Sequence, residues 1–331
     1  MSDIRLPFTH AEDLDRFPQH LKGGVVAIGN FDGVHRGHRV VLQHAIDIAE
    51  AAKAPVYAMT FEPHPRTVFN PDKPVFRLTP QQAKAEVMQA FGLDGVLVLP
   101  FTRDFAGLAA SDFVERILIG TLGIRHAVTG HDFHFGKARA GTPDFLRQSG
   151  EAHGFGVTIV EAETDEGGTT ISSSRIREAL AEGDIALANG LLGYRWFVEA
   201  EVRHGEKRGR ELGYPTANLR LADECPLRHG IYAVRVLVDG KPVDGVASYG
   251  RRPTFDNGAP LLEVFLFDFS GDLYGKQLRV SIVSYLRPEE RFTSVEALIE
   301  QMDRDSAEAR AALAAMQPLS PLDLALGSVP L

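Results

Sequence analysis

The first pattern along the chain is a short apolar run, a turn rich in glycine and then a helical stripe. Val25 to Ile28 are all apolar, and the segment Gly29 to His38 follows with three glycines and two histidines. Beyond this turn, apolar residues recur at helical spacing with polar residues between them: Val41, Ala45, Ile48, Ala49 and Ala52. The pattern predicts a strand, a loop and a helix that packs one face on a sheet.

The same alternation continues to about residue 186. Short apolar or β-rich runs stand at residues 56–61, 95–99, 126–129 and 155–160. Helix starts are expected between them at Thr79-Pro80-Gln81-Gln82, Ser111 and Thr142-Pro143. Strands separated by helices imply crossover connections and a mostly parallel sheet covered on both faces. We therefore predict a Rossmann-like α/β domain with ligands bound beyond the carboxyl ends of its strands.

The pattern changes near Tyr194, after which strand-like runs follow one another without helices. Five such runs are separated by Gly, Pro, Asp and Asn turns, at residues 196–202, 230–238, 243–248, 262–269 and 278–285. Asp239-Gly240 is a strong hairpin signal. Successive strands of this kind predict a small antiparallel β-barrel, whose closure leaves no exposed edge. A terminal helix is expected after Thr293 and Glu296, which form a capping box.

The length of 331 residues exceeds one ordinary hydrophobic core and suggests two domains. The change of pattern places the boundary between residues 184 and 195. We predict an α/β domain over residues 1–186, a barrel domain over 187–317 and a tail over 318–331. The tail is rich in Leu and Pro without a periodic pattern. Disorder of the tail, its docking on a partner subunit, and self-association through the barrel all stay open.

Composition narrows the classes of protein further. The net charge is −9, whereas dedicated binders of nucleic acid or anionic membranes concentrate Lys and Arg on one face. No run approaches the roughly 18 apolar residues of a membrane span, and residues 1–10 do not form a signal peptide. The single cysteine, Cys225, cannot form an internal disulfide. We expect a cytoplasmic protein without nucleic-acid or membrane partners.

The turn after the first strand offers a site for phosphate groups. Gly29, Gly33 and Gly37 permit positive φ and close approach of the backbone, and the next helix presents unpaired N–H groups to an anion. His35 and His38, three residues apart, can both donate hydrogen bonds to nucleotide phosphates. The alternatives are two ordinary surface histidines or half of a zinc site, for which the sequence lacks further ligands at matching spacing.

The whole segment from Gly29 to His38 resembles the first motif of the nucleotidylyltransferase superfamily, in the form of its FAD synthetase branch. Ile171 to Arg177 resembles the second motif, with Ser174 where that motif has threonine. The resemblance implies that His35 and His38 are catalytic. It also implies two sets of nucleotide contacts: Gly29, Asn30, Phe31 and Gly37 in the first motif, and Ser172, Ser173, Arg175 and Arg177 in the second.

Two middle segments are similar to the same branch. They are Thr60-Phe61-Glu62-Pro63-His64-Pro65 and the stretch from Gly130 to Lys137. Histidines and aromatic rings at this density suit a flat ring system and its phosphate. The resemblance implies flavin contacts from these segments and from one arginine of the barrel: Phe61, His64, Asp132, Phe133 and Arg287. By itself, His64 is more often structural than catalytic.

The barrel carries a separate set of motifs. Residues 209–219, which include Pro215-Thr216-Ala217-Asn218, resemble riboflavin kinases, as do segments 252–255, 272–275 and 286–292. The resemblance implies that Gly209 and Thr216 contact ATP, and Thr216 and Asn218 offer oxygen ligands for Mg²⁺. Glu263 stands in an apolar run, where a general base for an alcohol nucleophile is one reason for a carboxylate. An outward-facing residue paired with an arginine is the alternative.

Together the two sets follow the order of the bacterial bifunctional riboflavin kinase/FMN adenylyltransferase family. The resemblance implies that the barrel phosphorylates riboflavin to FMN with ATP and Mg²⁺. It further implies that the N-terminal domain joins FMN to AMP from a second ATP, which gives FAD and pyrophosphate. Two rivals stay open: a nucleotidylyltransferase for another phosphate substrate, with the barrel as a flavin-binding module, and a non-catalytic flavin sensor.

Overall fold

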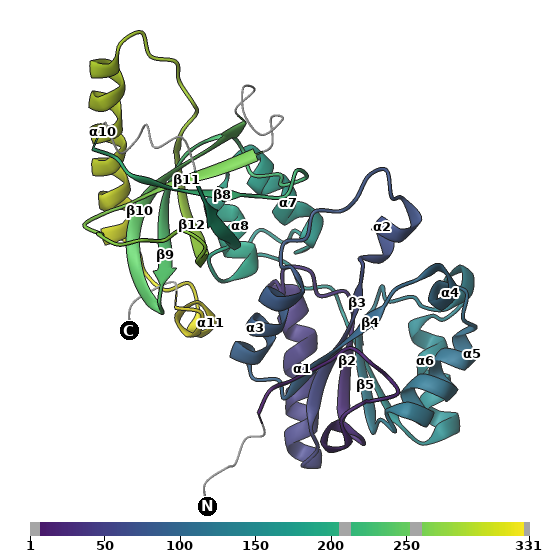
Figure 1. Cartoon of the computed structure of the whole chain (residues 1–331). Coiled ribbons are helices and arrows are strands. Elements are labelled where there is room, and N and C mark those ends of the chain that lie inside the picture. The colour runs from purple at the N-terminus through teal and green to yellow at the C-terminus, as the bar shows by residue number, and fades with distance from the viewer. Residues whose placement is uncertain (1–6, 205–212, 252–259, 328–331) are drawn as a thin grey trace, which may run out of the picture. The chain divides into compact units, whose positions relative to one another are not determined.

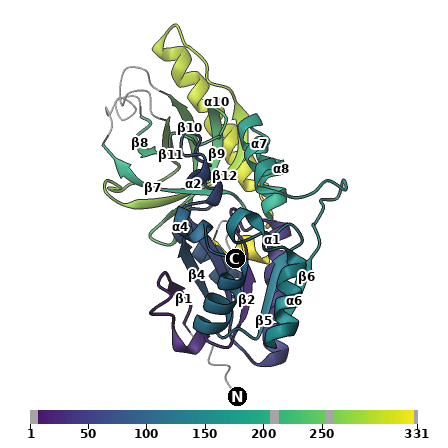
Figure 2. The same ribbon diagram turned by 90° about the vertical axis from the view of Figure 1, so that its right-hand side faces the viewer.

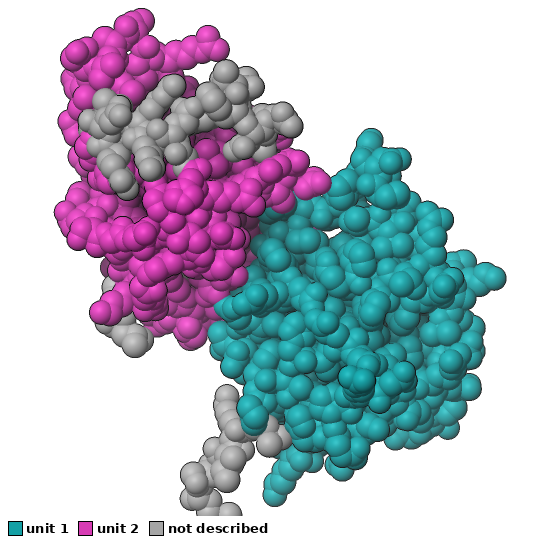
Figure 3. Space-filling view, in the orientation of Figure 1, with its two compact units in different colours: residues 1–173 teal, residues 174–331 magenta. Residues whose placement is uncertain are grey.

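The computed structural model describes residues 7–204, 213–251 and 260–327. The chain divides into two compact units, residues 1–173 and 174–331 (Figure 3). The division falls at the start of helix α7 (Ser173–Glu182), earlier than the predicted boundary at 186/187. Helix α7 packs with the second unit, because the Arg228 N–H donates to the Leu180 carbonyl at 3.0 Å and Arg228 Nη1 donates to the Glu182 carbonyl at 2.9 Å.

The first unit is built on a parallel sheet, as the alternation of strands and helices predicts, and the sheet has six strands, of which the first lies outside the predicted runs. Its strands are β1 (Thr9–Ala11), β2 (Val25–Ile28), β3 (Val56–Glu62), β4 (Gly95–Pro100), β5 (His126–Gly130) and β6 (Gly156–Val160). They lie in the order β1-β4-β3-β2-β5-β6, and every pair is parallel. The carboxyl ends of β2, β3 and β5 therefore meet at one edge.

Helices cover both faces of this sheet. Figure 1 shows α1 (Arg36–Ala52) and α3 (Gln81–Phe91) on one face, and α4 (Arg103–Ala106), α5 (Ala110–Asp112) and α6 (Pro143–His153) on the other. The π-helix η2 (Phe113–Thr121) continues from α5. The short segments η1 (Gln19–Leu21), α2 (Pro65–Phe69) and η3 (Lys137–Arg139) lie in the connections.

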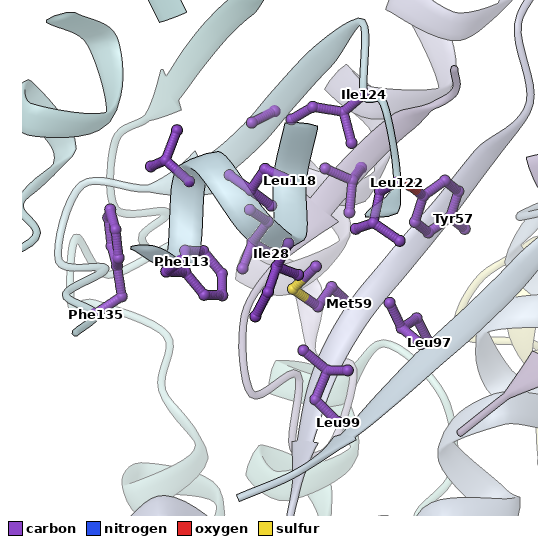
Figure 4. Close-up of a cluster of buried hydrophobic side chains, with 14 of the residues drawn as sticks. Ile28, Tyr57, Met59, Leu97, Leu99, Phe113, Leu118, Leu122, Ile124 and Phe135 are labelled. Carbon is purple, nitrogen blue, oxygen red and sulfur yellow. The ribbon is translucent and has the colours of Figure 1, made fainter. Parts of the chain in front are cut away.

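The core of the first unit lies between the sheet and η2 (Figure 4). Ile28, Met59 and Leu97 project from three neighbouring strands against Phe113 and Leu118 of η2, and all five side chains are buried. Close packing of this kind leaves the strand ends little freedom to move. The loops that follow β2 and β3 are thus held on a rigid base.

One predicted helix start has a different role in the structure. Helix α3 has Pro80 at its N-cap, and the Thr79 hydroxyl, expected to cap the helix, instead accepts a hydrogen bond from the Gly33 N–H at 2.8 Å. The Ser111 prediction was also wrong, because α5 has its N-cap at Ala109. At α6 the prediction is confirmed: the Thr142 hydroxyl accepts from the Phe145 N–H at 3.1 Å.

The second unit is a closed antiparallel barrel. Its strands are β7 (Phe197–Arg203), β8 (Thr216–Arg220), β9 (Gly230–Val238), β10 (Lys241–Arg251), β11 (Pro260–Leu266) and β12 (Gln277–Arg287). Around the barrel they follow the order β10-β11-β8-β7-β12-β9. The hairpin predicted at Asp239-Gly240 joins β9 to β10, with φ of 51° and 76° at the two turn residues. Strand β8 is absent from the strands that the sequence pattern predicts.

Helices complete the second unit. Besides α7 and α8 (Ile185–Leu192), the long helix α10 (Val295–Ala314) packs on β9, β10 and β12 (Figure 1, Figure 2). Its N-cap is Ser294, one residue after the expected Thr293, and the Ser294 hydroxyl accepts from the Ala297 N–H at 3.1 Å. The segment predicted as a tail contains helix α11 (Pro321–Ala325), whose Leu322 and Asp323 are buried.

Candidate active sites

The turn between β2 and α1 brings two imidazole rings together. His35 is the N-cap of α1, and its Nδ1 accepts a hydrogen bond from the His38 N–H at 3.2 Å. The chain reaches this cap through left-handed conformations at Phe31, Gly33 and Val34, with φ of 48°, 84° and 38°. The rings of His35 and His38 stack with centroids 3.6 Å apart and an interplanar angle of 17°. Both histidines therefore belong to one site at the start of a helix.

The surroundings of His38 keep its ring neutral. Burial lowers the pKa of His38 well below its usual value, and the nearby His35 and Lys84 lower it further. The Phe31 ring lies edge-on to His38 at 5.4 Å. Within the described residues, His38 Nδ1 is buried and has no hydrogen-bond partner. A neutral imidazole whose nitrogen is unpaired can donate a hydrogen bond to a ligand, or accept one from it, according to the tautomer.

A second segment fixes the turn from behind. The carboxylate of Asp32, 1% exposed, accepts from the N–H groups of Leu78 and Thr79, each at 3.2 Å. With the Gly33 contact to Thr79, these bonds tie residues 32–33 to the chain just before α3. Residues distant in sequence thus set the conformation of the turn between β2 and α1.

Sequence reasoning missed Lys84, which the structure places beside this turn. Lys84 is 1% exposed, and its Nζ donates to the Asn30 carbonyl at 2.8 Å and to the Thr60 hydroxyl at 3.1 Å. The available signal was a charged residue within an otherwise apolar helical stripe, made of Ala83, Ala85, Val87 and Met88. A lysine is almost never fully buried without a polar partner.

The second motif meets the first at one serine. The Ser173 hydroxyl donates to the Asp32 carbonyl at 2.8 Å, which brings the segment 171–173 to the turn after β2. Ser172 precedes it in the first unit, whereas Arg175 and Arg177 follow on α7 in the second unit. A joint action of these arginines with His35 and His38 stays a prediction.

A row of aromatic rings links the two segments expected to contact flavin. Phe61 at the end of β3 and Phe133 after β5 are connected through three further rings, with centroid separations of 5.0 to 6.3 Å: Phe105, Phe113 and Phe135. His64 is the N-cap of α2, where its Nδ1 accepts from the Arg66 N–H at 3.1 Å. Asp132 is exposed. The structure therefore brings Phe61 and Phe133 onto one aromatic cluster and gives His64 a structural bond.

The barrel brings its candidate residues together by strand register. Asn218 on β8 lies opposite Glu263 on β11, and Thr216 lies opposite Phe265. Alternation along each strand places Thr216, Asn218 and Glu263 on one face, while Leu262 and Val264 are buried on the other. Glu263 is partly buried, and Asn218 Nδ2 donates to the Thr216 carbonyl at 3.4 Å. A hydroxyl, an amide and a carboxylate thus share the outer face of the barrel.

Helix α10 supplies acidic partners near this face. Arg287 forms a two-bond ion pair with Asp305, with Nε–Oδ1 and Nη2–Oδ2 both at 2.7 Å, and this contact raises the pKa of Arg287. Tyr214, whose ring packs on Phe265 at 4.8 Å, donates its hydroxyl proton to Asp303. Burial and Asp303 raise the pKa of Tyr214 to about 12. Gly209 and the segment 252–255 lie outside the described residues.

Two further observations concern metal sites and membrane-spanning helices. Across the described residues, no three His, Cys, Asp or Glu side chains are grouped as a metal site would need. In that same part of the chain, no helix combines the length and apolarity needed to cross a membrane.

Comparison with family models gives two matches, one for each unit. The FAD synthetase model matches residues 17–175, and the riboflavin kinase model matches residues 192–313. The matches follow the order of the two motif sets along the chain.

Curated relatives match nearly the whole chain. The bifunctional riboflavin kinase/FMN adenylyltransferase of Escherichia coli (strain K12) is 41% identical over 299 residues, which cover 90% of this chain and 95% of the relative. The relatives of the same description from Pseudomonas fluorescens and Bacillus subtilis are 43% and 40% identical, over 89% and 86% of this chain and 94% and 91% of their own lengths. A solved structure described as a macrolide-efflux protein from Streptococcus pneumoniae superposes with a TM-score of 0.81 at 30% identity, over 92% of this chain and 99% of that chain.

The fold and its two sites define a class of protein, a tandem of a nucleotidylyltransferase-like α/β unit and a kinase-like barrel. The matched family models and the curated relatives identify the family within this class. The chain belongs to the bifunctional riboflavin kinase/FMN adenylyltransferase family.

Proposed function

We propose that this chain makes FAD from riboflavin in two ATP-dependent steps. The barrel phosphorylates riboflavin to FMN, and the α/β unit joins FMN to AMP from a second ATP and releases pyrophosphate. One observation carries the proposal: this member of the family has both residue pairs, the stacked His35/His38 pair in the first unit and the Asn218/Glu263 pair in the second.

In the kinase step, Glu263 acts as the general base. Its carboxylate takes the proton of the ribityl 5′-hydroxyl while that oxygen attacks the γ-phosphorus of ATP, and ADP leaves. The oxygen donors of Thr216 and Asn218 lie on the same face as Glu263, and this set of hard oxygen ligands fits Mg²⁺. When bound there, Mg²⁺ supplies neutralisation of the ATP phosphate charge. Thr216 and Gly209 contact the nucleotide.

In the adenylylation step, the FMN phosphate is the nucleophile. Its oxygen attacks the α-phosphorus of ATP, the bond to the β-phosphate breaks, and no covalent enzyme intermediate forms. His35 and His38 donate hydrogen bonds to the phosphates as charge develops, and the backbone of Gly29 to Phe31 and of Gly37 allows their close approach. The remaining phosphate contacts come from the second motif: Ser172, Ser173, Arg175 and Arg177.

The flavin ring of the second step lies against the aromatic cluster. Phe133 is partly buried and offers flat apolar surface that suits an isoalloxazine ring, and Phe61, which is buried at the end of β3, is the second aromatic contact in our proposal. His64 and Asp132 are its polar neighbours in our proposal, and Arg287 is the flavin contact of the barrel. A cytoplasmic location, the absence of nucleic-acid and membrane partners, and self-association stay predictions.

Incubation of the protein with riboflavin, ATP and Mg²⁺, followed by chromatography, tests the proposal directly. We expect FMN and then FAD to accumulate. A nucleotidylyltransferase for another substrate would consume no ATP with riboflavin, and a flavin sensor would bind riboflavin without product. Addition of FMN in place of riboflavin isolates the adenylylation step.

A further inference from the structure

Among the residues that the structure describes, Lys84 is the one buried ammonium group beside the turn between β2 and α1, and the proposed mechanism does not use it. It projects from α3 behind the turn, where its Nζ donates to the Asn30 carbonyl at 2.8 Å and to the Thr60 hydroxyl at 3.1 Å. The Thr60 hydroxyl in turn donates to the same Asn30 carbonyl at 2.9 Å. The three groups close a triangle that fixes the end of β2 against β3 and α3.

The charges around Lys84 come from three directions. Burial lowers the pKa of Lys84 to about 7, the cation of Arg77 lowers it further, and the carboxylates of Asp32 and Glu62 oppose this change. Arg77 itself lies between the two carboxylates, with an ion pair to Glu62 and its Nε 3.8 Å from Asp32 Oδ1. From α1, the stacked imidazoles of His35 and His38 face the same region, and Lys84 lowers the pKa of His38.

This arrangement makes the charge of Lys84 sensitive to an anion in front of the turn. Near neutral pH the ammonium is poised between its charged and neutral forms, because burial penalises the charged form. An anion of several charges, bound to the other side of a three-residue turn, favours the charged form through a medium of low dielectric constant. Binding then draws a proton from solvent, by thermodynamic linkage.

We propose that Lys84 is a buried positioning residue of the adenylylation site, which holds the Gly29–Phe31 turn through the Asn30 carbonyl and takes up a proton when nucleotide phosphates bind to that turn. The inference rests on the proposed assignment of the turn to ATP. Lys84 thus holds the turn in position before the nucleotide binds, and its positive charge balances the phosphate charge afterwards.

Proton uptake measured by calorimetry tests this inference. ATP with Mg²⁺ is titrated into the flavin-free protein at pH 8 in two buffers of different ionisation enthalpy. At this pH, His38 with its lowered pKa stays neutral, so we expect several tenths of a proton per protein chain to enter at Lys84 when ATP fills the adenylylation site. Proton uptake makes the measured binding enthalpy depend on the ionisation enthalpy of the buffer, and Lys84→Met should abolish this dependence. Lys22→Met, the same change at an exposed lysine before β2, should leave it intact.

A second measurement needs no variant. In protein labelled with ¹³C at lysine Cε, one resonance should titrate near pH 7 and shift its midpoint upward when ATP and Mg²⁺ are added. Lys84→Met should also reduce the rate of FAD formation from FMN by about tenfold, while riboflavin phosphorylation by the barrel stays normal. Absence of proton uptake in the wild-type protein, equal uptake in Lys84→Met, or the lack of such a resonance would overturn the inference.

These outcomes are separable from a failure of the proposed function. If the wild-type protein makes no FAD from FMN and ATP, the assignment of the turn fails. If it makes FAD but takes up no proton on binding ATP, only the role of Lys84 fails. Thr60→Val keeps the ammonium and removes one acceptor, so it should slow FAD formation and retain the proton uptake.

Discussion

At the scale of single residues, Glu263 shows how strand register creates a chemical site. Alternation alone left two interpretations of this carboxylate, a general base or an outward-facing partner of an arginine. The register places Glu263 on the outer face, directly opposite Asn218 and diagonal to Thr216. An outward-facing Glu263 was the mark of the alternative interpretation, a surface carboxylate paired with an arginine. In the structure, facing outward is also what places Glu263 beside its proposed partners, Asn218 and Thr216.

Glu263→Gln should abolish riboflavin phosphorylation and spare adenylylation. An amide of nearly equal size cannot accept the hydroxyl proton, so we expect FMN formation to fall by about 10²- to 10⁴-fold. Conversion of added FMN to FAD should continue at the normal rate, because His35 and His38 lie in the other unit. Chromatography of both products gives the two rates. Glu201→Gln, at an exposed position of β7, is the matched control. A near-normal kinase rate in Glu263→Gln would exclude its role as the base.

Lys84 also shows what a sequence pattern cannot supply. The apolar residues around Lys84 lie on the buried face of α3, but a lysine among such residues is ordinarily assigned to a solvated edge. Its partners, the Asn30 carbonyl and the Thr60 hydroxyl, are 54 and 24 residues away in sequence. Only the order of the parallel strands brings these three positions together.

Stability should depend on pH through Lys84. Its pKa is about 7 in the folded protein, against about 10.4 in an unfolded chain. Between these values the unfolded chain binds a proton that the folded protein lacks, so the free energy of unfolding rises with pH from 7 to 10. In the Lys84→Met variant, the free energy of unfolding should rise less between pH 7 and 10 than in the wild-type protein, by on the order of a few kcal/mol.

Urea unfolding followed by circular dichroism at several pH values measures this dependence. Lys22→Met should keep the wild-type slope. An unchanged slope in Lys84→Met would show that Lys84 does not titrate in this range.

At the scale of elements, the closed barrel and α10 are held by charge pairs as well as by packing. The apolar side of α10 contributes Ala309 and Leu313 to a small core with Phe267. Its Asp305, 4% exposed, binds Arg287 at the end of β12 and also accepts from Gln301 Nε2 at 2.9 Å. Arg287 is therefore both a proposed flavin contact and the anchor of α10.

Asp305→Ala should loosen α10 and destabilise the barrel. It leaves the partly buried guanidinium of Arg287 without its carboxylate, and loss of one partner of such a pair costs about 3 kcal/mol. The only tryptophan of the chain, Trp196, is 1% exposed in the second unit and reports its unfolding by fluorescence. Glu308→Ala, at an exposed position of the same helix, should be close to neutral. Equal stability of the two variants would contradict an anchoring role for Asp305.

The elements also mark where prediction from the sequence succeeds. Strong alternation and clear turn signals identified the parallel sheet, five barrel strands and the helix that follows them. Strand β8 was not found because Thr-Ala-Asn-Leu-Arg has little β-branched character, and its pairing with β11 and β7 is what makes it a strand. Helix starts were predicted least accurately: the Thr79 hydroxyl accepts from the Gly33 N–H instead of capping α3.

At the scale of the whole molecule, the residues proposed to be catalytic in the two activities lie in different units. The proposed base Glu263 lies in residues 174–331, and the stacked histidines lie in residues 1–173. The sequence alone predicted this tandem from two independent sets of motifs. It did not predict that the division falls at Ser173, because the contacts of Arg228 with α7 cross a long stretch of chain.

Two variants with complementary defects should restore the full pathway when mixed. His38→Ala should stop FAD formation and keep FMN formation, the reverse of Glu263→Gln. If FMN is released to solution between the steps, the mixture should convert riboflavin to FAD, whereas each variant alone should not. Chromatography at increasing protein concentration follows the recovery. A mixture that accumulates FMN without FAD would show that the FMN made by one chain does not reach the adenylylation site of another.

The ion pair between Arg195 and Asp323 has a consequence for synthesis of the protein. Arg195 lies two residues before the first barrel strand, β7, and the buried Asp323 accepts from both the Arg195 backbone N–H, at 3.0 Å, and the Arg195 guanidinium. A ribosome makes Arg195 well before Asp323, and domains generally fold from the N-terminus as they emerge. During that interval the cation has to remain hydrated, because burial without its carboxylate is costly. The barrel of a nascent chain therefore stays open at this corner until α11 has been made.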